Sequence, residues 1–393
     1  MHRILFVDDE PKILTGLQRM LRNMRREWEM SFAEGGPQAL RMLRASPFDV
    51  LVTDARMPGI EGAELLEIVR RECPDTVRII LSGQCSRDSL LRCVGVAHQF
   101  LSKPCDSEIL KDTVQRVCRL RNSFDDQEMR ATISAVASLP SVVSTYEALQ
   151  AQAAGEASLR TVGETIASDV AMSAKVLQLV SSGFLGSPQG AIEMERAIEL
   201  LGAETFRALA AQPNVFRPIP SGERSESLLR ELTVHSLAVA AAAKQIAESA
   251  TGAPSTIVQS RVAGMLHKVG TLVSYPLEST DSCMDRTSWD APASPPKTCC
   301  AQAGGYLASL WGLPAGIVEA IGCHRSPHRS GSSSFSALTA VHVANAFVEA
   351  ARNADGDAAG LLDHQYLARV GCTDRLDEWR EICHAACFGE VLQ

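Results

Sequence analysis

The chain has 393 residues, of which 46% are hydrophobic and 21% are charged, and its formal net charge is −8. This length predicts two to three domains with room for a sizeable core, and the acidic balance argues against a general nucleic-acid binder, which would carry a basic face. No apolar run reaches about 18 residues, no secretory leader begins the chain, and the twelve cysteines lack an exported context, so we expect reduced thiols in a cytoplasmic protein without a membrane span.

Short apolar runs that stop at a polar residue recur in the first third of the chain. Such runs are typical of buried parallel strands, and helical patterns lie between them. The polar residues are Asp8 and Asp9, then Asp54 after Val50–Val52, then Ser82, and finally Lys103. The helices are predicted near Pro11–Glu27, Gly36–Ala45, Ala63–Glu72, Arg87–Val94 and Ser107–Leu120.

The three acidic residues are expected to share one cleft. In open α/β sheets, ligands bind beyond the carboxyl ends of the strands, and Asp8, Asp9 and Asp54 all follow such ends. Three carboxylates there need a counter-cation, and a hard divalent ion with oxygen ligands is the natural one. A lysine such as Lys103 beside them would neutralise a phosphoryl oxygen. The alternative for an isolated Asp54 is a helix cap or a satisfied loop residue.

Acids, a hydroxyl and a lysine on successive strand ends resemble the receiver domain of two-component response regulators, over residues 1–122. The resemblance implies an α/β, doubly wound, flavodoxin-like domain with a five-stranded parallel sheet. It implies that Asp54 is the phosphoacceptor and that Asp8, Asp9 and Asp54 hold Mg²⁺. It further implies that Ser82 is the switch hydroxyl, Lys103 the phosphate-binding cation and Phe100 the aromatic residue that changes rotamer. The loop residues Met57, Pro58 and Gly62 also fit the pattern.

After an expected linker at residues 123–138, which contains the acidic run Asp125–Glu128, the chain reads as one helix after another. Apolar residues recur there at intervals of three and four, which is typical of helices packed on a core. Residues 350–393 are expected to form a C-terminal helical extension. The helices are predicted at Val142–Ala153, Thr161–Ser181, Ile192–Leu201 (closed by Gly202), Leu228–Glu248 and Ile257–Leu272.

A second resemblance, to the HDOD domain, spans about residues 126–349, and the domain itself is expected at 139–349. It is carried by five segments in order: Asp169–Leu177, Arg196–Gly202, His235–Ala240, Ala263–Gly270 and Trp311–Pro314. The HDOD domain is an all-α relative of the HD phosphohydrolases and is common as an output module in bacterial signalling. The resemblance therefore implies an all-α, HD-like helical domain after the receiver.

The residues at the HD metal positions predict a degenerate site. An active HD site collects His and Asp ligands around divalent metals that activate water. Here Lys268 stands where the Asp of the His-Asp pair belongs, and an ammonium group repels a dication. We therefore expect no metal and no catalysis in this domain, and His235 and His267 are then core histidines. The full set of positions is His235, His267, Lys268, Cys300, His324, Arg325 and Asn345.

Three smaller clusters could also carry a function. A zinc site at Cys372, Cys383, His384 and Cys387 would need all four side chains to converge, and Cys299-Cys300 has no partner at zinc-like spacing. The basic cluster Arg19, Arg22, Arg25 and Arg26 could dock a partner, but a solvated helix face is the simpler interpretation.

The sequence thus predicts a response regulator that a sensor histidine kinase phosphorylates and that acts through contact with an unidentified downstream protein. Homodimerisation and release of an intramolecular contact both stay open, as does nucleotide binding by the helical domain. The enzymatic alternative is a receiver-controlled cyclic di-GMP phosphodiesterase of the HD-GYP type, against which the missing ligands and the absent Gly-Tyr-Pro triplet argue. Direct DNA binding is not expected, because no helix-turn-helix follows the linker.

Overall fold

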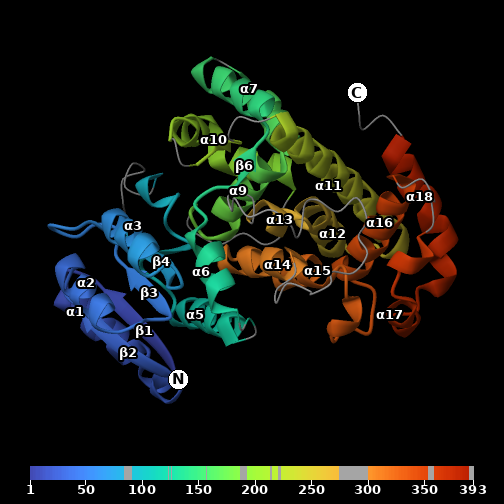
Figure 1. The fold of residues 1–393 in the computed structure, drawn as a ribbon. Coiled ribbons are helices and arrows are strands. Elements are labelled where there is room, and N and C mark those ends of the chain that lie inside the picture. Colours follow the sequence, from blue (N-terminus) through green and yellow to red (C-terminus); the bar gives the residue numbers. More distant parts are fainter. Residues whose placement is uncertain are drawn as a thin grey trace. The chain divides into compact units, whose positions relative to one another are not determined.

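The structure, a computed structural model, divides into two compact units (Figure 1). Unit 1 comprises Met1–Ser138, Gln178–Gln189 and Ser309–Gly312, and unit 2 comprises Leu139–Leu177, Gly190–Ala308 and Leu313–Gln393. The residues described are 1–83, 91–122, 124, 126–155, 157–185, 193–212, 215–219, 223–273, 300–352 and 358–388.

Unit 1 is built on a five-stranded sheet in which every neighbouring pair is parallel, in the order β2-β1-β3-β4-β5. All four residues of β3 and all six of β4 are buried, which accounts for their mainly apolar sequences, although β4 also contains Arg78. The predicted flavodoxin-like, doubly wound receiver fold is confirmed. The strands are β1 (His2–Val7), β2 (Trp28–Ala33), β3 (Val50–Thr53), β4 (Val77–Ser82) and β5 (Gln99–Ser102).

Helices connect the strands of unit 1. The first predicted helix ends earlier than expected, and a 3₁₀ helix (Arg22–Arg26) follows it, so that Leu21 and Met24 become buried. The helix predicted at Arg87–Val94 lies largely outside the described residues. The described helices are α1 (Pro11–Met20), α2 (Gly36–Ala45), α3 (Gly62–Glu72), α5 (Ser107–Asn122) and α6 (Gln127–Ala135).

Helix α6 occupies most of the segment that was expected to be a linker. Its first turn is capped by Asp126, whose side chain accepts the backbone N–H of Met129 at 3.0 Å. Ile133 and Ser134 are fully buried, and the helix packs against α3 within unit 1. Helix α6 is therefore part of unit 1.

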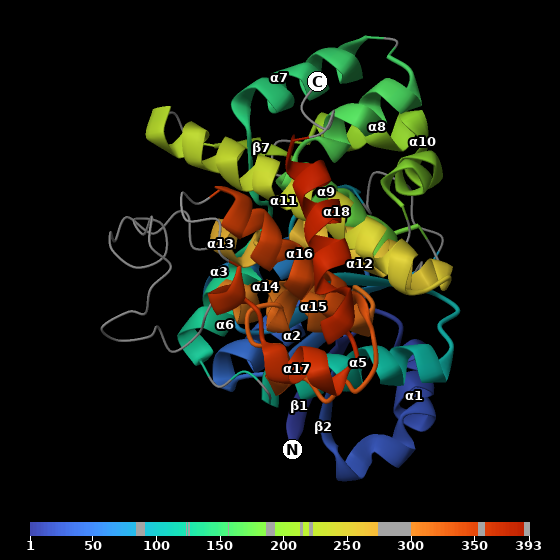
Figure 2. The same ribbon diagram turned by 90° about the vertical axis from the view of Figure 1, so that its right-hand side faces the viewer.

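The rest of the chain is helical apart from one pair of two-residue strands, β6 (Pro140–Ser141) and β7 (Arg217–Pro218). Helix α16 is buried along most of its length, with α11, α12, α15 and α18 packed against it (Figure 2). No helix among the described residues is long and apolar enough to cross a membrane. The helices are α7 (Val143–Ala154), α8 (Leu159–Ala167), α9 (Val170–Ser181), α10 (Met194–Ala210), α11 (Glu223–Ala250), α12 (Pro254–Leu266), α13 (Val269–Val273), α14 (Cys300–Leu310), α15 (Ala315–Cys323), α16 (Ala337–Arg352), α17 (His364–Arg369) and α18 (Leu376–Phe388).

One predicted helix is divided in the structure, and another ends where it was predicted to end. The single helix predicted at Thr161–Ser181 is two helices, α8 and α9, because the buried Asp169 starts the second one. Its carboxylate accepts the N–H of Met172 and of Val142, each at 2.9 Å. The helical geometry is interrupted at Gly202, where φ is 70° and ψ is 157°, so α10 consists of two helical stretches, and the first ends at Gly202 as predicted.

Candidate functional site

Two of the predicted acidic residues lie side by side at the carboxyl edge of the unit 1 sheet. Asp8 follows β1 and Asp54 follows β3, and these strands are parallel neighbours with Val7 opposite Thr53. The backbone N–H of Asp54 continues the ladder by donating to Val7 O at 2.9 Å. Both side chains are largely withdrawn from water, since the residues are 2% and 9% exposed.

Lys103 joins these two carboxylates. Its Nζ donates to Asp8 Oδ2 at 2.6 Å and also to Asp54 Oδ1. Its backbone N–H donates to Ser82 O at 2.6 Å, which fixes the lysine just beyond β5. Burial alone would lower the pKa of Lys103, but its hydrogen bonds to Asp54 and Asp8 outweigh burial and raise that pKa. The ammonium group is therefore held in its charged form.

The loop after Asp54 packs closely around that residue. The backbone N–H of Arg56 donates to Asp54 Oδ2 at 2.6 Å. Gly62 lies so close that a Cβ there would be 2.2 Å from Asp54 O and 2.9 Å from Ala55 Cα. Only glycine permits this approach, and Gly59, with φ of 82°, makes the preceding turn.

The predicted switch residues occupy the neighbouring strands. Ser82 ends β4 and is buried, and its Oγ donates to Gly83 O at 3.3 Å. Phe100 on β5 is 2% exposed, and its ring meets that of Phe184 edge-on with centroids 5.3 Å apart. The backbone N–H of Phe100 donates to Ser182 O at 2.8 Å, within unit 1.

The oxygen donors at this edge suit a hard cation such as Mg²⁺. Asp8 and Asp54 already converge on one positive charge, that of Lys103. The third predicted ligand, Asp9, is exposed. Among the described residues, no group of three or more His, Cys, Asp and Glu side chains is arranged to hold a metal ion. Coordination by all three acids would therefore require Asp9 to turn toward the other two.

In unit 2, part of the degenerate HD set converges on the amide of Asn345. His235 on α11 and His267 at the end of α12 each place Nε2 3.0 Å from Asn345 Oδ1. The Asn345 amide nitrogen donates to Glu349 Oε2 at 3.3 Å. Burial lowers the pKa of both histidines well below the ordinary value, and nearby Lys268 and His324 act in the same direction. Neutral imidazoles thus surround an amide where a metal-ligand carboxylate would be expected.

His324 and Lys268 complete this cluster. The His324 ring is 5.1 Å from that of His267, and its Nδ1–H donates to Ile321 O at 2.9 Å. Its Nε2 is buried and has no hydrogen-bond partner among the described residues. Burial lowers the pKa of His324 to about 3, and it lowers that of Lys268 to about 8 although the Glu349 carboxylate acts to raise the latter. Two other positions of the set are Cys300, at the start of α14, and the exposed Arg325.

Sequence reasoning missed Glu349, which is 6% exposed and lies one helical turn after Asn345. The available signal was the spacing of four residues, which places two side chains on the same face wherever the chain is helical. The cysteines weighed for zinc are not gathered into a metal-binding group in the part of the chain that is described. Burial raises the pKa of Cys383, which keeps this thiol protonated. The basic cluster Arg19, Arg22, Arg25 and Arg26 is exposed, as a solvated helix face would be.

Comparison with protein families finds two matches. The response regulator receiver domain matches residues 4–115, and the HDOD domain matches residues 136–327.

Individual relatives agree with the first match. The chain is 28% identical to the chemotaxis protein CheY of Pseudomonas aeruginosa over 121 residues, which is 29% of this chain and 94% of CheY. It is 27% identical to the hydrogenase transcriptional regulatory protein HoxA of Cupriavidus necator over 276 residues, 68% of this chain and 48% of HoxA. The chain thus spans about half the length of HoxA, and it spans 27% of the response regulator PilR of P. aeruginosa, with 31% identity. Among solved structures, the receiver domain of an HD domain-containing protein from Pseudomonas fluorescens Pf-5 is 27% identical, with a TM-score of 0.30 over 31% of this chain and 98% of that one.

Proposed function

We propose that this chain, a two-component response regulator that joins an N-terminal receiver domain to a C-terminal HDOD domain, is phosphorylated on Asp54 by a histidine kinase and signals through an HDOD domain without catalytic activity. The observation that carries the proposal is the triangle of Asp54, Lys103 and Asp8 at the carboxyl edge of the sheet. The domain limits that we propose are 1–122 for the receiver and 139–349 for the HDOD domain.

The triangle suits phosphoryl transfer to a carboxylate. A carboxylate oxygen of Asp54 would form the new bond to phosphorus while the bond to the phosphodonor breaks. Lys103 would then turn from Asp54 toward a phosphoryl oxygen, and the backbone N–H of Arg56 would hold the second Asp54 oxygen. A Mg²⁺ ion, held by Asp8, Asp9 and Asp54 when bound, would offset the charge of the phosphoryl group.

The absence of catalysis in the HDOD domain is supported by the charges around its two central histidines. Lys268 adds positive charge beside His235 and His267, and Asn345 offers a neutral amide between them. A metal that activates water needs anionic ligands to bind tightly. This arrangement favours a signalling domain over a phosphodiesterase.

The route of the signal is supported by the surroundings of Phe100. Phosphorylation would draw Ser82 toward the phosphoryl group and change the space available to Phe100. The Phe100 ring contacts Phe184, and the Phe100 N–H donates to Ser182 O. A change at Phe100 would therefore alter contacts of two residues within the segment that matches the HDOD domain. The output would be an altered contact with a downstream protein, through dimerisation or through release of an intramolecular contact.

The test is labelling of the purified full-length chain by acetyl phosphate. We expect Mg²⁺-dependent addition of one phosphoryl group, detected by intact mass, and its loss in the Asp54→Asn variant. An Asp49→Asn variant serves as a matched control, because Asp49 lies before β3 and at the other end of that strand. Equal labelling of wild type and Asp54→Asn would refute the assignment.

A further inference from the structure

The C-terminal end of helix α6 is held by two receiver strands. Ser134 O, one of the last carbonyls of the helix, accepts hydrogen bonds from Arg78 on β4 and from His98 just before β5. The His98 tautomer follows from its other contact, because Nδ1 accepts the backbone N–H of Arg78 at 3.0 Å. Nε2 therefore carries the hydrogen and donates to Ser134 O at 3.0 Å.

Arg78 and α6 depend on each other. The guanidinium group is buried inside unit 1, and the residue is 1% exposed. Its other donors are directed at backbone carbonyls, including Val96 O at 2.7 Å and Thr76 O at 3.2 Å. The negative end of the α6 dipole thus helps to stabilise a buried cation, and the cation caps the helix. Arg70 on α3 adds a second cation there by donating to Ala135 O at 3.3 Å.

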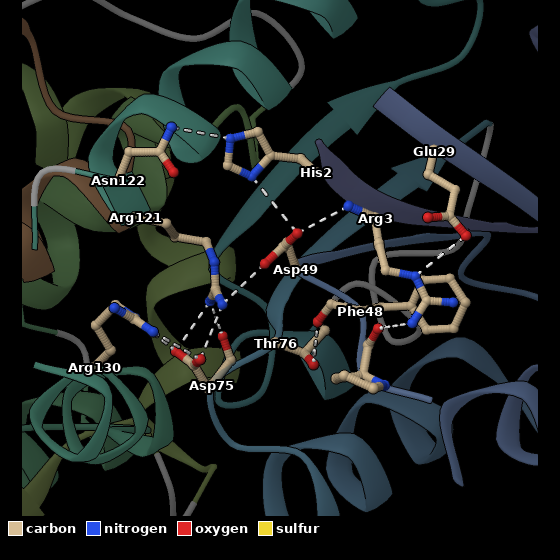
Figure 3. A network of polar contacts seen from close by, with 11 residues as sticks. His2, Arg3, Glu29, Phe48, Asp49, Asp75, Thr76, Arg121, Asn122 and Arg130 are labelled. Atoms are coloured by element: carbon tan, nitrogen blue, oxygen red, sulfur yellow. Dashed lines mark hydrogen bonds and ion pairs between the residues drawn. The ribbon is translucent and has the colours of Figure 1, made fainter. Parts of the chain in front are cut away.

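The other end of α6 is fastened by alternating charges. Arg130 donates to both carboxylate oxygens of Asp75, at 3.2 and 3.4 Å. Arg121, at the end of α5, donates to the same carboxylate at 3.0 and 2.9 Å and also pairs with Asp49 at 3.1 Å. Figure 3 shows this chain of residues, in which Arg121 lies between Asp49 and Asp75. Helix α6 is therefore tied to the receiver at both ends.

The contacts at the two ends of α6 involve different parts of the receiver. Asp49 and Asp75 lie in the segments that precede β3 and β4. Arg78 is within β4, which ends at the predicted switch hydroxyl Ser82, and His98 directly precedes β5, which carries the predicted switch aromatic Phe100. Both donors lie near the amino ends of these strands, so a shift of β4 against β5 along their whole length would also displace the two donors that meet at Ser134 O.

From this placement we propose that the C-terminal end of α6 is a regulatory latch: Arg78 and His98 hold Ser134 O when the receiver is unphosphorylated and release it on phosphorylation. The release step rests on the proposed phosphorylation of Asp54, whereas the holding step does not. Release frees the last turn of α6 and the residues after it, which lead into the HDOD match at residue 136.

The experiment is hydrogen exchange by mass spectrometry on the full-length chain, with and without beryllofluoride as the phosphoryl mimic. In wild type, we expect beryllofluoride to speed exchange across residues 127–135. In Arg78→Met, we expect this exchange to be about tenfold faster or more without the mimic and no longer to respond to it. The strand β4 itself should stay protected, because an apolar side chain of similar length tolerates this buried position.

Two further variants keep the test decisive. Arg78→Lys retains the charge but lacks the planar fork of donors, so it should expose α6 even if Arg78→Met does not fold. Arg44→Met removes an exposed arginine that pairs with Glu72 and should leave α6 exchange as in wild type.

The outcomes separate the two proposals. Wild-type α6 exchange in both Arg78 variants would refute the latch. The latch would also be refuted if beryllofluoride changed hydrogen exchange in residues 77–82 and 99–102 but not in residues 127–135. The proposed phosphorylation of Asp54 would stand in that case. If α6 exchange does not respond to the mimic and Asp54 is not labelled either, the proposed function and the release step are refuted. The holding step would still stand.

Discussion

Two lysines, Lys103 and Lys268, lie in opposite electrostatic settings. Lys103 lies between the carboxylates of Asp8 and Asp54, and its hydrogen bonds raise its pKa against the effect of burial. Lys268 lies near two neutral imidazoles, and burial lowers its pKa to about 8. The first setting gathers negative charge that suits Mg²⁺ and a phosphoryl group. The second carries positive charge where an HD enzyme would place a metal.

The second setting predicts that metal binding can be created by changing charge. In the variant Lys268→Asp with Asn345→Asp, two carboxylates would join His235, His267 and Glu349. We expect this variant to bind about one Zn²⁺ or Co²⁺ per chain, because two imidazoles and carboxylates form a complete ligand set. Equilibrium dialysis followed by elemental analysis measures the stoichiometry.

The matched control is Lys268→Gln with Asn345→Gln, which removes the positive charge but adds no carboxylate, and it should bind no metal. Stoichiometric metal in the wild-type protein, lost on His235→Ala, would contradict the proposed silent site.

At the scale of elements, much of the receiver could be predicted from the sequence because β3 and β4 are buried along their whole length. An apolar run then stops where the strand stops, so the sequence predicts both the strand and the polar residue at its end. Helix α2 has the predicted bounds, Gly36–Ala45. The break between α8 and α9 could not be predicted from the sequence, because the Asp169 carboxylate accepts the N–H of Val142, which lies 27 residues earlier in the chain. The docking of α6 depends likewise on Arg78, which in the sequence is one charged residue inside an apolar strand.

The loop after β3 gives a prediction at this scale. In Gly62→Ala the new Cβ would lie 2.2 Å from Asp54 O, so the loop must shift. We expect a loss of about 1–3 kcal/mol in the free energy of unfolding and slower labelling of Asp54 by acetyl phosphate. Urea unfolding and a labelling time course measure the two effects.

Gly16→Ala is the control for this change. Gly16 lies within α1 with open space around it, so alanine should stabilise by roughly 0.4–1 kcal/mol and leave labelling unchanged. Equal labelling rates in both variants would show that the close approach of Gly62 does not position Asp54.

At the scale of the whole molecule, the two family matches leave residues 116–135 between them. This stretch contains the end of α5 and the whole of α6, and two of its arginines, Arg121 and Arg130, pair with the carboxylates of Asp49 and Asp75. Helix α6 is thus part of unit 1. The sequence predicted the order of the two domains from their motifs. It could not predict this attachment, which is made by side chains far apart in the chain.

The central claim is that phosphorylation of Asp54 changes how the HDOD domain is presented. Small-angle scattering of the full-length chain, with and without beryllofluoride, tests it most directly, with Asp54→Asn as the control that should not respond. We expect the wild-type curve to change, through a changed radius of gyration or a doubled mass, and the variant curve to stay fixed. The account would be contradicted if acetyl phosphate labels Asp54 fully but neither acetyl phosphate nor beryllofluoride changes the scattering curve or the mass of the scattering particle.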